Sequence, residues 1–190
     1  GGLITDTFNA MLPGVGAAAA ASAAADGDRD EDSHRGGGGR RHHRRDVDLL
    51  SLDIDGIDLY LVQPILETVN PRVIVVEYQD IIGPRRALTV PYASDFTAKW
   101  IRGNPDFAGA SLPAFIAVLS RWGYHFVGCE GLGFNGFFVR SDVIAEGNAA
   151  GRGSVRLTTP EESGCFAVPK VRAGMEERWP RVADEPWVEV

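Results

Sequence analysis

Hydrophobic residues follow two different periods between residues 47 and 78, and together they predict a strand, a helix and a second strand. The apolar run Val47–Asp53 ends in an acid and is typical of a buried parallel strand. The next apolar side chains recur at spacings of three and four, and predict a helix capped by Asp58: Leu59, Val62, Leu66 and Val69. The β-branched run Arg72–Tyr78 predicts the second strand, so the three elements form a βαβ unit.

The pattern after this unit predicts a long loop, one helix and a hairpin. Pro64 predicts a kink or a restart in the first helix, and residues 79–110 form a loop rich in Pro, Gly and aromatic residues. Ser111 is expected to cap a second helix that has Pro113 in its first turn and ends at Gly123. Strands follow at residues 124–129 and 134–140, and the short connection between them permits only antiparallel pairing.

Composition divides the 190 residues into four zones. Residues 1–13 predict a short amphipathic helix, and residues 14–45 a disordered, low-complexity insertion. The basic and histidine-rich run at its end, Arg40–Arg45, is interpreted as a solvated linker rather than a metal or nucleic-acid tract. Residues 46–146 form the ordered α/β part, and residues 147–190 an irregular tail. The end of this tail, Trp187–Val190, is expected either to dock on the domain or to remain extended.

Charge and cysteine content restrict the class of protein. The net charge is −7, and residues 46–146 carry 13 acidic against 7 basic side chains, a net charge of −6, which argues against a nucleic-acid surface. The chain has no apolar run long enough to span a membrane. Cys129 and Cys165 form no recognisable motif, so reduced thiols are predicted. A soluble, cytoplasmic protein is the default expectation, and Gly1 in place of a start methionine predicts a fragment.

The acidic loop Asp53–Asp58 is the most informative candidate site. It follows a buried strand, and ligands of open α/β sheets bind outside the carboxyl ends of the strands. Gly56 is expected to let the chain turn sharply and to admit a ligand close to the backbone. Glu77 ends the neighbouring strand, so it should face the same crevice as Asp53. Carboxylates placed there can accept hydrogen bonds from hydroxyls or amines, hold a hard cation, or act as a base.

Two known patterns explain this loop poorly. The haloacid-dehalogenase phosphatases have an Asp-x-Asp-Gly pattern that continues with Thr or Val, whereas Ile57 stands here. The later lysine and acidic pair of that family have no match either. The Asp-x-Asp metal signal of some glycosyltransferases is only three residues long and carries little information. No metal is therefore assigned to the loop.

A third pattern covers about 100 residues. Motifs in the same order resemble the FkbM-like methyltransferases, and they are Asp48–Gly56, Pro71–Tyr78, Gly109–Leu112, Gly123–Cys129 and Phe134–Arg140. The resemblance implies the second half of an α/β, Rossmann-like methyltransferase fold, a mostly parallel sheet with a closing antiparallel hairpin. It also implies S-adenosylmethionine as the cofactor and a small-molecule hydroxyl as the methyl acceptor.

The resemblance also assigns roles to particular residues. Asp53 and Asp55 are the candidate catalytic acids, and Asp53, Gly56 and Glu77 would border the cofactor. Tyr78 and Asn135 would border the acceptor. Positioning of the acceptor oxygen against the methyl group would supply much of the rate, with an acid as base.

One departure from the family matters. The glycine-rich loop and the second-strand acid that hold most of the cofactor have no counterpart in these 190 residues. The strand at residues 48–53 would then be a bare edge open to association. The alternative hypothesis is a non-catalytic remnant of the methyltransferase fold or an interaction module.

Overall fold

The computed structural model describes residues 44–101, 103–151, 154–167 and 174–190. The expected helix at residues 1–13 lies outside this range, as do residues 14–43 of the expected insertion. In chain order the described elements are β1 (Arg45–Leu52), α3 (Asp58–Thr68), β2 (Val69–Glu77), η1 (Asp80–Ile82), β3 (Leu88–Thr89), β4 (Lys99–Ile101), β5 (Asn104–Phe107), α4 (Leu112–Ser120), β6 (Tyr124–Cys129), β7 (Asn135–Arg140), α5 (Ser141–Ala149), α6 (Met175–Arg178), η2 (Trp179–Arg181) and β8 (Val188–Glu189).

A small mixed sheet organises the fold, with strands in the order β1-β2-β7-β6. β1 and β2 pair in parallel across the crossover helix α3, which confirms the predicted βαβ unit. β7 pairs antiparallel with both β2 and β6, and the predicted hairpin is confirmed. Because the hairpin inserts β7 between β2 and β6, two of the three pairings are antiparallel and the sheet is mixed, although β1, β2 and β6 all run in the same direction.

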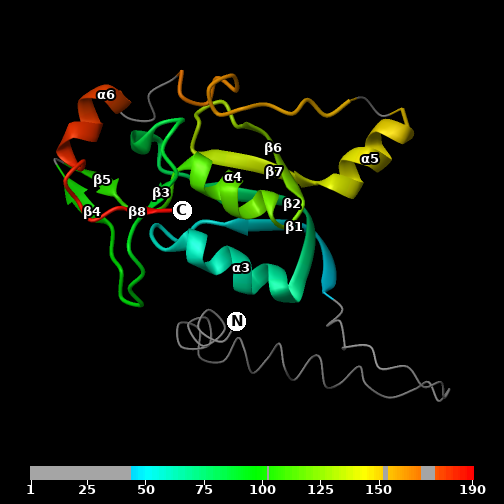
Figure 1. Ribbon diagram of the computed structural model, residues 1–190, viewed down its shortest axis with the longest axis horizontal. Helices are drawn as coiled ribbons and strands as arrows, with labels where there is room; N and C mark the ends of the chain where they lie inside the picture. Colours follow the sequence, from blue (N-terminus) through cyan, green and yellow to red (C-terminus); the bar gives the residue numbers. More distant parts are fainter. Residues whose placement is uncertain (1–43, 102, 152–153, 168–173) are drawn as a thin grey trace, which may run out of the picture.

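Helices α3 and α4 cover one face of this sheet and lie side by side (Figure 1). Ser111 caps α4 as predicted, because its hydroxyl accepts a hydrogen bond from the amide of Ala114, and Pro113 lies in the first turn. Helix α3 continues through Pro64, so the expected restart does not occur there. Side chains of both helices and of the sheet form the main core, and the fully buried ones include Leu66, Ile74, Phe115, Leu119 and Phe138.

The other face of the sheet is apolar but has no buried side chain in its central rows. The register aligns Leu49, Val73 and Val139 in one row, and Val75 with Phe137 in the next. All five are half-buried or exposed, and Leu49 is 59% exposed. Since β1 also forms the end of the described sheet, its outer edge and this face are both open in the described part of the chain.

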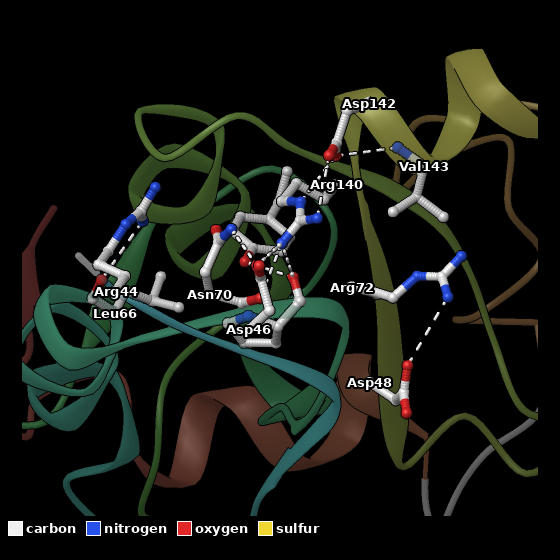
Figure 2. A network of polar contacts seen from close by, with 11 residues as sticks. Arg44, Asp46, Asp48, Leu66, Asn70, Arg72, Arg140, Asp142 and Val143 are labelled. Atoms are coloured by element: carbon white, nitrogen blue, oxygen red, sulfur yellow. Dashed lines mark hydrogen bonds and ion pairs between the residues drawn. The ribbon is translucent and has the colours of Figure 1, made fainter. Parts of the chain in front are cut away.

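Polar contacts fasten the end of the sheet at which β1 and β2 begin (Figure 2). The Arg140 guanidinium donates to the carbonyl oxygen of Asn70 at 2.7 Å, and its Nε lies 2.6 Å from Asp142. The Asn70 side-chain amide in turn donates to Asp46 at 2.8 Å. These contacts connect β1, β2 and the start of α5, at the end of the sheet opposite the acidic loop.

The 79–110 segment and the C-terminal residues form a second, smaller core. β3 pairs with β8, so the end of the chain docks on the domain, which decides between the two sequence-based alternatives. Trp187 contributes by packing its ring against Phe107, with ring centroids 4.7 Å apart. Its indole nitrogen donates to the carbonyl oxygen of Val182.

A buried arginine joins these two segments. Arg178 of α6 is 3% exposed, and its guanidinium donates to both carboxylate oxygens of Asp80 at 3.1 Å. The same guanidinium donates to Oδ1 of Asp106 at 2.8 and 2.9 Å, and Asp106 is fully buried. One cation therefore serves two buried carboxylates that are 98 and 72 residues away in sequence.

The sequence-based prediction of free thiols is wrong. Cys129, at the end of β6, forms a disulfide with Cys165, which lies 36 residues later in the segment 154–167. No local motif announces this pair, because it forms only when that segment folds back onto the hairpin.

Replacing Arg178 with Ala should destabilise the protein by about 3–5 kcal/mol, because two buried carboxylates lose their counter-charge. Urea denaturation followed by tryptophan fluorescence measures this change. Arg181→Ala is the matched control. Within the described residues, Arg181 forms its ion pair with the exposed Glu177, so its removal should cost about 0.5 kcal/mol or less. Equal losses in the two variants would contradict a structural role for the buried pair.

Candidate functional site

The parallel register of β1 and β2 creates the candidate site. Leu52 lies opposite Val76, so the residues that follow, Asp53 and Glu77, emerge at the same edge of the sheet. Asp55 joins them, and carboxylate oxygens of the three acids lie within 4.8 Å of one another. The sequence-based expectation placed these acids at one crevice, and the structure brings them together there.

The turn that carries Asp55 differs in detail from the one expected. Asp55, rather than Gly56, adopts the left-handed conformation, with φ at +57°. Aspartate is one of the few residues that tolerate this region. Gly56 is required for another reason, because a Cβ at this position would lie 2.9 Å from Cδ1 of Phe96. The close approach at Gly56 is thus made by the ring of Phe96.

Asp58 does not cap α3 as predicted. It is the first residue of the helix, and Ile57 occupies the capping position without a side-chain hydrogen bond. The Asp58 carboxylate instead accepts hydrogen bonds from the preceding amides of Ile54, at 2.8 Å, and Gly56, at 3.0 Å. It therefore closes the acidic loop on itself. Burial raises the pKa of Asp58, and the hydrogen bonds from Gly56 and Ile54 only partly offset this effect.

A cavity of about 90 Å³ opens beside the acidic loop. Its wall combines residues from the loop, the end of β2, the 79–110 segment and α6. The lining includes Asp55, Asp58, Glu77, Tyr78, Asp80, Phe134 and Arg178. Asp80 and Arg178 were not predicted as site residues, because no local sequence pattern marks them. The buried ion contact between them is what places both side chains in the cavity wall.

Tyr78 lines this cavity, whereas Asn135 lies beside it at the edge of the sheet. Tyr78 is 2% exposed, and its hydroxyl donates to the carbonyl oxygen of Cys165 at 3.3 Å. Burial raises its pKa, and the nearby charges of Asp80 and Glu130 add to this effect. Asn135 opens β7 directly opposite Glu77. Both residues predicted to border an acceptor therefore adjoin the acidic edge.

The turn before Asn135 is held by Glu130. Its carboxylate accepts hydrogen bonds from the amides of Leu132, Phe134 and Asn135. Burial opposes ionisation of Glu130, but these hydrogen bonds outweigh it and lower its pKa. The carboxylate thus orders the connection that carries Phe134 to the cavity and leads into β7 at Asn135.

Three carboxylates at this spacing can accept hydrogen bonds from hydroxyl or ammonium groups, or share a hard cation.

A comparison with known protein families, curated proteins and solved structures finds no match to this chain. None of the helices in the described ranges has the length and apolar character that crossing a bilayer requires.

The raised pKa of Asp58 predicts a specific pH dependence of stability. Its folded-state pKa lies above the ordinary value of 3.8, so its favourable contribution is complete below that value. The contribution is lost as pH rises through the raised pKa. The free energy of unfolding of the wild type, relative to Asp58→Asn, should therefore fall as pH rises from about 3 to 7.

Urea denaturation of both proteins at several pH values measures this difference. Asp48→Asn is the control, because the Asp48 side chain is 93% exposed. The free energy of unfolding of the wild type relative to this variant should change little with pH. A difference between wild type and Asp58→Asn that is flat, or that rises with pH, would contradict the burial effect.

Proposed function

We propose that this chain carries part of an S-adenosylmethionine-dependent O-methyltransferase, similar to the FkbM-like family, and that its acidic edge borders the methyl-transfer site. The observation that carries the proposal is the direction of the strands. β1, β2 and β6 run the same way, whereas β7, the last strand of the sheet along the chain, runs against them. The sequence resemblance implies this arrangement for the second half of a Rossmann-like methyltransferase fold.

The donor set at the edge suits part of such a cofactor. Ribose hydroxyls and an amino-acid ammonium are hydrogen-bond donors, and Asp53, Asp55 and Glu77 offer acceptors. The cavity of about 90 Å³ is smaller than the roughly 300–1,000 Å³ of a typical ligand pocket. The described residues therefore fit contact with one portion of the cofactor, bordered by Asp53, Gly56 and Glu77.

The chemistry assigned to the chain's own residues is positioning and proton removal. When bound, the cofactor would supply a sulfonium methyl group for the acceptor oxygen, and its sulfur would be left as a neutral thioether. Asp53 or Asp55 would orient the acceptor hydroxyl and take its proton as the new bond to oxygen forms. Tyr78 and Asn135 would shape the acceptor side of the edge, beside Glu77.

Binding of S-adenosylhomocysteine tests this proposal without knowledge of the acceptor. Ligand-observed NMR should detect binding to the chain, and Asp53→Asn combined with Glu77→Gln should weaken it roughly tenfold to hundredfold. This range corresponds to the loss of one or two hydrogen bonds to charged groups. Thermal melting of each variant would show that the fold is retained.

Asp48→Asn is the matched control, because it removes an exposed carboxylate from the middle of β1, the strand that leads into the site. Its affinity should equal that of the wild type. Absence of any binding to the wild-type chain would overturn the proposal, as would equal weakening by Asp48→Asn and by the site variant.

The open edge of β1 favours a second candidate function, that of an interaction module that pairs with a second copy of itself. An antiparallel pairing of two β1 strands centred on Leu49 would place each Leu49 against its counterpart. The same register sets Arg45 of each copy opposite Asp53 of the other and places no like charges directly opposite. Opposite charges across strands stabilise such pairs, and like charges destabilise them.

Leu49→Lys should therefore shift the chain from dimer to monomer in sedimentation-velocity ultracentrifugation. Leu132→Lys is the control, because Leu132 is 63% exposed on the turn between β6 and β7, away from this edge. The hypothesis would be contradicted by a wild-type chain that stays monomeric at high concentration. It would also be contradicted if Leu49→Lys and Leu132→Lys lowered the dimer fraction equally.

A further inference from the structure

The segment 154–167 lies against the wall of the cavity and contributes no helix or strand of its own. It contacts the domain through the ion pair of Glu161 with Arg85 and through Cys165 and Phe166 at Tyr78. The carbonyl oxygen of Cys165 accepts a hydrogen bond from the Tyr78 hydroxyl, and the ring of Phe166 packs on Tyr78 with centroids 5.7 Å apart. The buried wall residue Tyr78 is thus in direct contact with this segment.

Gly133 provides the space for this contact. A Cβ at Gly133 would lie 2.7 Å from the carbonyl oxygen of Cys165 and 3.4 Å from the Tyr78 hydroxyl. The backbone of Gly133 has φ at +74°, a region that glycine adopts without strain. The next residue, Phe134, lines the cavity, and its carbonyl oxygen accepts a hydrogen bond from the Tyr78 amide. The segment, the turn and the wall therefore fit together at Tyr78.

The Cys129–Cys165 disulfide is the covalent link that holds this arrangement. Cys129 ends β6 and is partly exposed, whereas Cys165 is 3% exposed. Of the two cysteines, Cys129 is therefore the one more accessible to a reductant. Disulfides persist in oxidising compartments and are reduced where glutathione and thioredoxin act.

We propose that Cys129 and Cys165 form a redox-modification site that controls the wall of the cavity at the acidic edge. In the oxidised state the bond holds the segment 154–167 on Tyr78. Exchange with a dithiol gives two protein thiols and one dithiol-derived disulfide, so two electrons and two protons pass from the dithiol to the cysteines. The segment then leaves Tyr78 and Gly133, and the wall opens. This inference concerns access to the cavity and does not depend on the chemistry proposed for it.

Hydrogen exchange followed by mass spectrometry tests the proposal with dithiothreitol as the dithiol. Reduction should accelerate exchange in peptides covering residues 76–80, 133–135 and 154–167. The expected increase is on the order of tenfold to hundredfold, because reduction returns to the detached segment the chain entropy that a link across 36 residues removes. Exchange in α3 should remain unchanged, since this helix lies in the main core.

A double variant, Cys129→Ala with Cys165→Ala, should show fast exchange in these peptides with and without dithiothreitol. Wild-type protein reduced and then alkylated gives the same test without substitution, should the double variant fail to fold. Unchanged exchange at residues 76–80 after reduction would overturn the proposal. Equal acceleration in α3 would overturn it as well, because the disulfide would then stabilise the whole fold rather than the wall.

Discussion

Parallel pairing of β1 with β2 is the interaction on which the rest of the structure depends. It forces a crossover, which α3 supplies, and it sets both strand ends at one edge of the sheet. The register of Leu52 with Val76 then brings Asp53 and Glu77 together without any direct bond between them. Slippage by one residue would send Leu50 and Leu52 to the open face and separate the two acids. The core and the candidate site are therefore fixed by the same register.

Assembly of the cavity wall demands contacts that are much more distant in sequence. Arg178 reaches Asp80 and Asp106 from α6, and Cys165 reaches Tyr78 from a segment without regular structure. Burying a guanidinium and two carboxylates removes their hydration, so the ion contacts contribute more to the position of α6 than to net stability. The Oδ2 atom of Asp106 has no hydrogen-bond partner in the described residues, which increases this cost. The buried ion contacts thus fix the position of the cavity wall, although burying these charges carries a large desolvation penalty.

The contrast between local pairings and contacts distant in sequence explains how much the sequence could predict. The βαβ unit, the Ser111 cap and the closing hairpin depend on local periodicity and on short connections, and these predictions are confirmed. The convergence of Asp53, Asp55 and Glu77 follows from the topology alone. The role of Asp58 could not be predicted, since a capping acid and an acid that binds the preceding loop share one sequence pattern. The Cys129–Cys165 disulfide and the Arg178 contacts join residues that are 36 to 98 positions apart in sequence, so no local pattern predicts them.

The open face of the sheet limits what the acidic edge can do by itself. Parallel strands normally lie between two helical layers, and here α3 and α4 form one layer in the described residues. The other face remains half-buried at Val73, Val75 and Phe137. Each Å² of apolar surface left in water there forgoes roughly 25 cal/mol of stabilising free energy. Whatever covers this face would also flank Asp53, because both border β1. A partner that buries Leu49 without contributing groups beside Asp53 would stabilise the sheet but leave the acids as exposed as they are now.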